Sequence, residues 1–242
     1  MVRYGFWMSA AVVLVLGLAA ATGWAQEASI KASIKAAEKA IETADPDAVD
    51  PNLIKGEKWT VDFQFERPEP IVVTGPTGEK QIYWYVLYTV TNKTGQDRTF
   101  VPVFTLFTDS GAVSRAGIYP TVYDAIKKSR KVKFLENGVQ MIGKLLIGED
   151  NARTGVAIFA PLSFKTTRFS IFVEGLSGEF IERPEPAAPP QGGAAKPEEI
   201  KPDADKLIRL RKAMALTYTL PSENWMTTLD QPVFQCKKWT WR

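Results

Sequence analysis

The sequence predicts a mainly β protein, an antiparallel β-sandwich with a short N-terminal helix before it and one short helical excursion within it. Apolar residues recur at every second position in several segments, such as residues 59–66, 168–173 and 208–220, which is the pattern of strands with one buried face. Glycine, proline and asparagine separate these segments as turn residues do. About eight or nine strands joined by turns are typical of a sandwich in one domain.

The N-terminus has the features of an export signal. Arg3 precedes an apolar run over residues 6–21, and the small residues Gly23 and Ala25 fit a signal-peptidase site. We therefore predict a signal peptide over residues 1–25, cleaved after Ala25, and a periplasmic or secreted mature protein. The alternative is an uncleaved membrane anchor, because the apolar segment approaches the length of about 20 residues that a spanning helix needs.

The residue types that the chain lacks exclude several kinds of chemistry. Among 242 residues there is no His and one Cys. Without His, Ser-His-Asp and Cys-His triads, His-containing zinc sites and His-ligated haem are excluded. Cys236 alone cannot close an intrachain disulfide. We expect it to be a buried small hydrophobic residue, with an intermolecular disulfide as the alternative.

The overall charge argues against one class of partner. Lys and Arg number 30 against 27 Asp and Glu, so the net charge of +3 is too near neutral to indicate nucleic-acid binding. Together with the missing His, this composition predicts no cofactor and no metal, and it favours a protein that is not an enzyme.

The first expected element of the mature chain is a helix over residues 27–43. Ile30, Ile34 and Ile41 form one narrow stripe at helical spacing. Two Asp-Pro pairs follow and end the helix. We therefore predict a helical stalk and linker over residues 26–57, which precedes a single β-sandwich domain over residues 58–242.

The first strands of that domain follow from changes in period. Apolar and polar residues alternate from Trp59 to Glu66. Residues 82–91 are rich in aromatic and β-branched residues on both parities, which predicts a central strand buried on both faces. Residues 100–108 predict the returning strand, with Pro102 near its start or at a bulge.

The second half of the domain continues the pattern. A short helix is expected over residues 121–130, after Pro120. Further strands are expected over residues 140–147, 155–159, 168–173 and 233–241. Strand-like alternation from Ile208 to Leu220 is preferred to a helix over residues 203–215.

Residues 183–205 are the clearest low-complexity segment of the chain. They are rich in Pro, Gly and Ala, so they cannot bury enough apolar surface to offset the entropy of ordering them. We predict a mobile surface loop between two strands of one domain.

The middle of the chain carries turn and core residues that resemble a known family. Residues 89–95 read Thr-Val-Thr-Asn-Lys-Thr-Gly and residues 104–111 read Phe-Thr-Leu-Phe-Thr-Asp-Ser-Gly. This hairpin resembles that of secreted bacterial immunoglobulin-like domains, including the FxLYD type, although Phe107 replaces the family's Tyr and Thr108 its Asp. Gly148-Glu149 followed by residues 155–161 is similar to a related exported sandwich family of unknown function.

The resemblance covers about residues 59–175 of the chain. It implies an immunoglobulin-like β-sandwich located in the bacterial cell envelope, and it implies no catalytic residues.

A run of positive charges is the first candidate site. Five cationic residues fall within seven positions, namely Lys127, Lys128, Arg130, Lys131 and Lys133. Such a run is a candidate patch for anionic polysaccharide, lipid head groups or an acidic partner. Charge runs are common, so a solvated helix end whose lysines protect an edge strand is the simpler interpretation.

Acidic and aromatic residues offer two weaker candidates. Glu149, Asp150 and Asn151 could contribute oxygens to a Ca²⁺ site, but no EF-hand spacing surrounds them and a β-turn is favoured. Tryptophans of a sandwich usually lie in the core. Trp225 lies instead in the turn-rich segment 221–230, so we expect it to be an exposed aromatic residue.

These observations predict an exported, non-catalytic module for binding or structure in the cell envelope. Its partner would be another envelope protein or an anionic polysaccharide. A carbohydrate-binding or carbohydrate-active domain remains an alternative. It would use carboxylates and the tryptophans Trp84, Trp225, Trp239 and Trp241. A membrane-tethered accessory subunit that retains its N-terminal apolar segment is the other alternative.

Overall fold

The structure is a computed structural model that describes residues 49–75, 77–185, 203–221 and 224–242. The predicted signal peptide, the helix over residues 27–43 and the centre of the Pro-rich segment lie outside these residues. Residues 49–242 are assigned to one compact unit. Within the described part of the chain, no helix is both long enough and apolar enough to span a bilayer.

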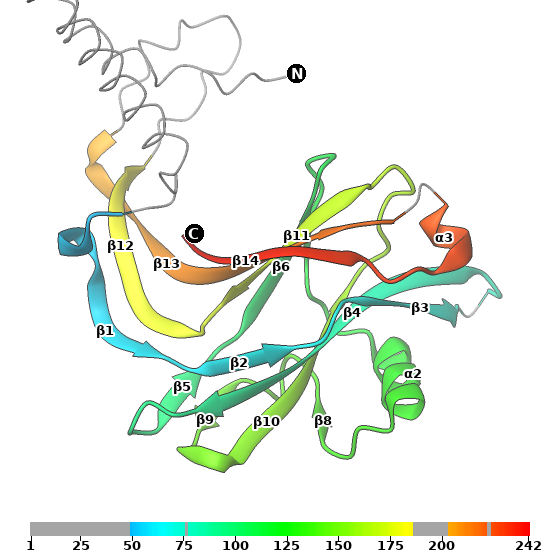
Figure 1. The fold of residues 1–242 in the computed structure, drawn as a ribbon, viewed down its shortest axis with the longest axis horizontal. Coiled ribbons are helices and arrows are strands. Elements are labelled where there is room, and N and C mark those ends of the chain that lie inside the picture. Colours follow the sequence, from blue (N-terminus) through cyan, green and yellow to red (C-terminus); the bar gives the residue numbers. More distant parts are fainter. Residues whose placement is uncertain (1–48, 76, 186–202, 222–223) are drawn as a thin grey trace, which may run out of the picture. The chain divides into compact units, whose positions relative to one another are not determined.

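Two antiparallel sheets pack face to face, as the sequence predicts (Figure 1). The seven-stranded sheet is built from β1 (Lys55–Thr60), β12 (Ser177–Glu185), β13 (Asp203–Thr219), β11 (Arg168–Glu174), β6 (Val103–Thr108), β7 (Val113–Arg115) and β14 (Val233–Trp241). The five-stranded sheet is built from β2 (Asp62–Phe65), β3 (Glu69–Thr74), β4 (Lys80–Asn92), β10 (Gly148–Phe159) and β8 (Leu135–Glu136). The packed sheets are shown, whereas an immunoglobulin-like strand order is not confirmed.

Short elements complete the described chain. Strands β5 (Arg98–Phe100) and β9 (Gly143–Leu145) form a two-stranded sheet. The helices are η1 (Pro51–Leu53), α2 (Pro120–Arg130) and α3 (Trp225–Thr228). Among the paired strands that are described, β8 and β10 alone run parallel. Helix α2 confirms the helical excursion predicted over residues 121–130.

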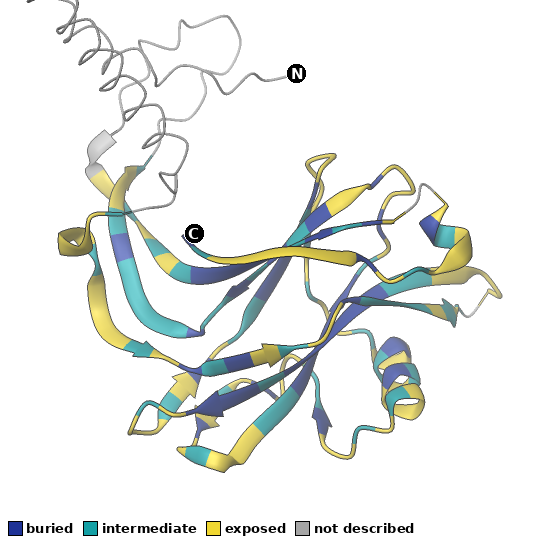
Figure 2. Cartoon of the chain, in the orientation of Figure 1, coloured by how far each residue is buried: buried dark blue, intermediate teal, exposed yellow. Residues whose placement is uncertain are grey.

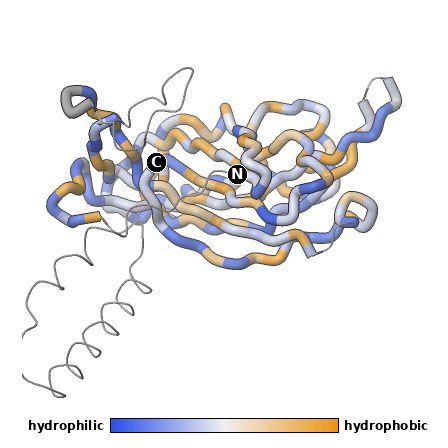
Figure 3. The backbone as a smooth tube through the Cα atoms, turned by 90° about the horizontal axis from the view of Figure 1, so that it is seen from above, coloured by the Kyte–Doolittle hydropathy of each residue, from blue (hydrophilic) through white to orange (hydrophobic). Residues whose placement is uncertain are grey.

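The main core lies between the two sheets. Its largest fully buried side chains are Trp84, Trp225, Tyr218, Phe100, Phe159 and Phe169. Strand β4 is mostly buried, whereas β14 is mostly exposed (Figure 2). Hydrophobic and hydrophilic stretches alternate along the strands (Figure 3), because successive side chains of a strand point to opposite faces.

Strand β4 confirms the prediction of a central strand buried on both faces. Trp84 and Tyr88 face the main core, whereas Tyr85 and Leu87 belong to a second apolar cluster. That cluster includes Ile126 of α2. The helix therefore covers the outer face of the five-stranded sheet and buries the second parity of β4.

In two long segments, consecutive strands pair with different partner strands. The alternating segment that starts at Trp59 is divided into β1 and β2, which belong to different sheets. Strand β11 continues into β12 through Gly175, where the partner changes from β6 to β1. Gly175 has φ +88°, and a Cβ there would lie 2.4 Å from the carbonyl oxygen of Val101, so glycine is required at this junction.

Some expected boundaries differ from the observed ones. The strand expected over residues 140–147 is reduced to β9, and β3 and β12 were not predicted. Alternation from Ile208 to Leu220 corresponds to β13, so the strand was the correct alternative. Strand β1 already begins at Lys55, within the segment expected to be a linker, and β12 continues to Glu185.

Candidate functional site

The predicted basic run lies at the end of α2 and in the loop that leads to β8. Lys127 and Lys128 occupy the last turn of the helix, where positive charge is favourable because the helix dipole is negative there. Lys131 ends the helix in the left-handed conformation with φ 53°, and Lys133 follows in the loop. All four lysine residues are exposed.

Arg130 does not belong to the exposed patch, which corrects the sequence-based site. Its guanidinium pairs with Glu69 at 2.8 Å and also with Glu66. Glu69 in turn accepts hydrogen bonds from the hydroxyl of Tyr85 and from the side-chain amide of Gln231 at 2.9 Å. Arg130 therefore fixes α2 to the five-stranded sheet, and its charge is already neutralised.

The electrostatics of this network agree with its geometry. Burial alone would lower the pKa of Arg130, but Glu69 and Glu66 raise the pKa above its usual value. Burial and the hydrogen bond to Glu69 raise the pKa of Tyr85. Arg130 thus remains a cation and Tyr85 a hydrogen-bond donor, so the anchor of α2 does not depend on pH near neutrality.

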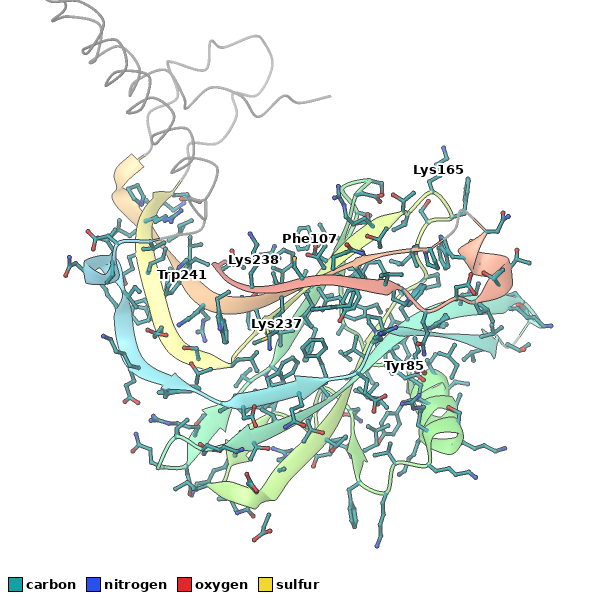
Figure 4. All side chains as sticks on the ribbon, viewed as in Figure 1. Tyr85, Phe107, Lys165, Lys237, Lys238 and Trp241 are labelled. Carbon is teal, nitrogen blue, oxygen red and sulfur yellow. The ribbon has the colours of Figure 1, made fainter. Side chains whose placement is uncertain are left out.

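An exposed phenyl ring follows the four lysines in the chain. Phe134 is 75% exposed, and the ammonium nitrogen of Lys133 lies 5.3 Å from its ring centre. Long side chains project into solvent beyond α2 and its following loop (Figure 4). We use the name basic patch for Lys127, Lys128, Lys131, Lys133 and Phe134. The sequence signal that could have indicated Phe134 is its position directly after the charged run.

A second phenyl–lysine pair lies in the loop between β10 and β11. Phe164 is 65% exposed, and the ammonium nitrogen of Lys165 lies 5.6 Å from its ring centre. Lys165 projects from a different side of the molecule than α2 (Figure 4). This pair has the local chemistry of Lys133 and Phe134 without three neighbouring lysines, so it serves as an internal control.

Trp225 is buried, so the expectation of an exposed aromatic residue is wrong. It belongs to the short helix α3, is 1% exposed and lies 5.5 Å from Trp84 between ring centres. Neither indole nitrogen has a hydrogen-bond partner among the described residues. The apolar ring fills the main core, which removes two of the tryptophans considered for a sugar-binding surface.

Cys236 is exposed, so the expectation of a buried cysteine is also wrong. It lies on β14, which pairs only with β13 among the described strands. Lys237 and Lys238 follow it on opposite faces of this edge strand, and Lys237 points toward β2 (Figure 4). The ammonium nitrogen of Lys237 lies 5.9 Å from the ring centre of Phe65.

The acidic segment at residues 149–151 forms the irregular start of β10 instead of a separate turn. The register between β10 and β4 shifts between Gly148 and Arg153. Glu149 pairs with Lys93 at 2.9 Å. Within the described part of the chain, no group of three His, Cys, Asp or Glu side chains is placed to hold a metal ion.

Several hollows lie outside the basic patch, including one of about 330 Å³ that is lined by Arg209 and Arg211. Two others differ in their lining. One, of about 430 Å³, lies between the β3–β4 hairpin and the start of α2, with Tyr83 and Tyr119 in its wall. The other, of about 220 Å³, lies on the seven-stranded sheet and is lined by Arg168 and Arg242 among others. The second hollow is the only one of these two that is lined by arginine.

The fold and these surfaces define a mainly β protein of packed antiparallel sheets with a basic patch at the end of its one long helix in the described chain. No family model, no curated protein and no solved structure matches the chain.

Proposed function

We propose that the chain is a non-catalytic binding module, exported to the bacterial cell envelope, that attaches to an anionic membrane surface through the basic patch. The observation that carries this proposal is a phenyl ring with 75% exposure beside Lys133, close in the chain to three more exposed lysine residues. Isolated apolar side chains are common on protein surfaces. A protruding ring within a group of cations is the arrangement that membrane-surface proteins use.

The two kinds of side chain favour a lipid surface over an anionic polysaccharide. Lysines attract any polyanion, and each contributes about 1 kcal/mol near an anionic leaflet. Phe134 gains less from a strongly hydrated anionic polymer than from a bilayer, where it loses contact with water on entering the boundary between head groups and acyl chains. A bilayer therefore uses both components of the basic patch, whereas a polysaccharide uses mainly the lysines.

The structure supports the patch mechanically. Arg130 holds the last turn of α2 against Glu69 and Glu66, so Lys127 and Lys128 extend from a fixed helix end. Val122 and Ile126 bury the opposite side of the helix. The backbone that carries Lys127 and Lys128 therefore needs little ordering on binding, which reduces the entropic cost of attachment.

Export and the absence of catalysis rest on the sequence. Residues 1–25 have the features of a signal peptide, and the chain contains no His. The resemblance to secreted bacterial immunoglobulin-like domains supports the same location. The packed antiparallel sheets are compatible with that class of domain.

Vesicle co-sedimentation of residues 26–242 tests the proposal. We expect binding to vesicles of phosphatidylcholine with phosphatidylglycerol, little binding to phosphatidylcholine alone, and loss of binding at high salt because the lysine contribution is screened. Phe134→Ala should weaken binding at least about fivefold, since burial of a Phe side chain is worth about 1.5–3 kcal/mol.

Phe164→Ala is the matched control, because Phe164 has comparable exposure and its own lysine neighbour. It should leave vesicle binding unchanged. Equal losses in the two variants, or equal binding to neutral and anionic vesicles, would overturn the proposed function.

A further inference from the structure

The hollow of about 220 Å³ lies on the outer face of the seven-stranded sheet, the face turned away from the core. Residues of β6 and β11 form most of its wall, and the last residue, Arg242, closes it. The residues that the argument uses are Phe107, Asp109, Arg168, Ser170, Phe172 and Arg242. Phe107 is seen on the upper side of the sheet (Figure 4).

The guanidinium of Arg242 is held against two phenyl rings. Its central carbon lies 4.1 Å from the ring centre of Phe107 and 4.0 Å from that of Phe172. These rings are perpendicular to each other, with centres 5.3 Å apart. Arg242 is fixed at its backbone, where its N–H donates to the carbonyl of Arg211 at 2.9 Å. The side chain is therefore positioned from both ends.

The strand register explains how Arg242 reaches these rings. Phe172 lies opposite Ala215 on β13, and Arg242 pairs with Arg211 four residues earlier on the same strand. The intervening outward residue is Ala213, and both alanines are buried. Small side chains at these two positions leave room for the Arg242 side chain to cross the sheet.

The hollow carries two guanidinium groups without a carboxylate partner. Among the described residues, no carboxylate oxygen lies within 4.0 Å of the side-chain nitrogens of Arg168 or Arg242. Nη1 of Arg242 is buried without a hydrogen-bond acceptor there. Glu174 acts on Arg242 from a longer distance, but burial has the larger effect and lowers the pKa of Arg242.

Asp109, the one Asp or Glu side chain in the wall of this hollow, is already occupied. Its Oδ2 accepts hydrogen bonds from the backbone N–H groups of Thr167 and Arg168, both at 3.0 Å, and from the Thr167 hydroxyl at 2.5 Å. It does not pair with either arginine side chain. The hollow therefore has an excess of positive charge in an environment that is partly removed from water.

Arg209 shows that stacking alone does not leave an arginine unpaired. Its guanidinium carbon lies 4.1 Å from the ring centre of Phe180, which is the same contact that Arg242 makes. Arg209 also pairs with Glu182 at 3.2 Å. Arg242 differs from Arg209 because no carboxylate of the described residues pairs with its guanidinium.

We propose that this hollow binds a small carboxylic acid with an apolar body. A carboxylate matches the planar fork of an arginine through two parallel hydrogen bonds. The phenyl rings of Phe107 and Phe172 offer an apolar wall to the rest of the ligand. The volume of about 220 Å³ is below the ~300 Å³ at which sites for drug-sized ligands begin, so the acid is small.

Titration calorimetry of residues 26–242 with benzoate tests the charge and the shape together. Benzamide has the same shape without the charge, and inorganic phosphate has the charge without the apolar body. We expect saturable binding of benzoate, at least tenfold weaker binding of benzamide, and weaker binding of phosphate. Equal affinity for benzamide and benzoate, or tighter binding of phosphate, would overturn the proposal.

Three variants locate the binding. Arg168→Gln and Arg242→Gln should each weaken benzoate binding at least about tenfold, since each removes a charged hydrogen-bond donor. Arg209→Gln is the matched control and should leave the affinity unchanged. Arg168 is exposed, so its variant should fold even if Arg242→Gln does not. An unchanged affinity in Arg168→Gln, or an equal loss in Arg209→Gln, would overturn the assignment.

Discussion

The two sheets differ in what covers the apolar residues on their outer faces. On the five-stranded sheet, Tyr85, Leu87 and Ile158 form an apolar outer face that α2 covers with Val122 and Ile126. On the seven-stranded sheet, no described helix covers the outer face.

Small and polar residues dominate that second face. Ala213, Ala215 and Ser170 are small residues of β13 and β11 on this face. Arg242 covers part of the rings of Phe107 and Phe172, and the rest of these rings lines the hollow. The guanidinium removes part of these rings from water, as α2 removes the outer face of the five-stranded sheet from water.

The difference teaches how a sheet face acquires a function. An apolar cover such as α2 buries the face through hydrophobic contacts and leaves no charged group without a counter-ion. A charged cover such as Arg242 shields only part of the rings, and it brings a cation that needs an anion. The covered face therefore contributes stability, and the open face is the one we assign to a ligand. Three predictions separate these roles.

The largest expected effect concerns the apolar cover. Ile126→Ala should lower the free energy of unfolding by about 2–5 kcal/mol, because it opens a cavity beneath α2. Val113→Ala, at a residue of the open face that is 58% exposed, should cost less than about 1 kcal/mol. Urea denaturation of both variants measures the contrast. Equal costs would show that the two faces contribute alike.

The second effect compares two arginines. Arg130→Gln should cost about 1–3 kcal/mol, because it leaves Glu69 without its charged partner; the side chains of Arg130 and Glu69 are only 29% and 21% exposed. Arg168→Gln should change the free energy of unfolding by less than about 0.5 kcal/mol, since Arg168 has no partner to abandon within the described chain. Denaturation curves that reverse this order would contradict the distinction between an anchoring and a ligand-binding arginine.

Long periodic segments were predictable from the sequence. Residues 208–220 correspond to β13, because burial on one parity constrains every second side chain. Residues 82–91 correspond to β4, because aromatic and β-branched residues on both parities are typical of a central strand. Strands β3 and β12 were missed because each contains proline in the repeated segment Glu-Arg-Pro-Glu-Pro. Pro70 is tolerated because β3 pairs only with β4, and Pro184 lies where β12 has extended beyond β1.

The candidate sites were less predictable, because they depend on contacts between distant strands. The charged run was visible, but the pairing of Arg130 with Glu69 joins residues 61 positions apart. Trp225 lies among turn residues, and only the packing against Trp84 shows that it is buried. Arg242 approaches Phe107 and Phe172 through the register of β6, β11 and β13, which periodicity does not specify.

The smallest expected effect concerns Asp109 at the rim of the open face. Burial would raise the pKa of its carboxyl group, but hydrogen bonds from Thr167 and Arg168 outweigh burial and lower it. Because the folded pKa is below the unfolded value of about 3.9, this contribution is fully present above that pH. It is lost as pH falls through the folded pKa.

Asp109→Asn should therefore cost less than about 1 kcal/mol at pH 7, and its difference from the unmodified chain should shrink as pH falls below about 4. Asp150→Asn, at an exposed position on β10, is the control for the removal of one carboxylate. Urea denaturation at pH 7 and at low pH measures both. A cost for Asp109→Asn that grows toward low pH would mean that the ionised carboxylate destabilises the fold. That result would contradict the excess of positive charge that we assign to the open face.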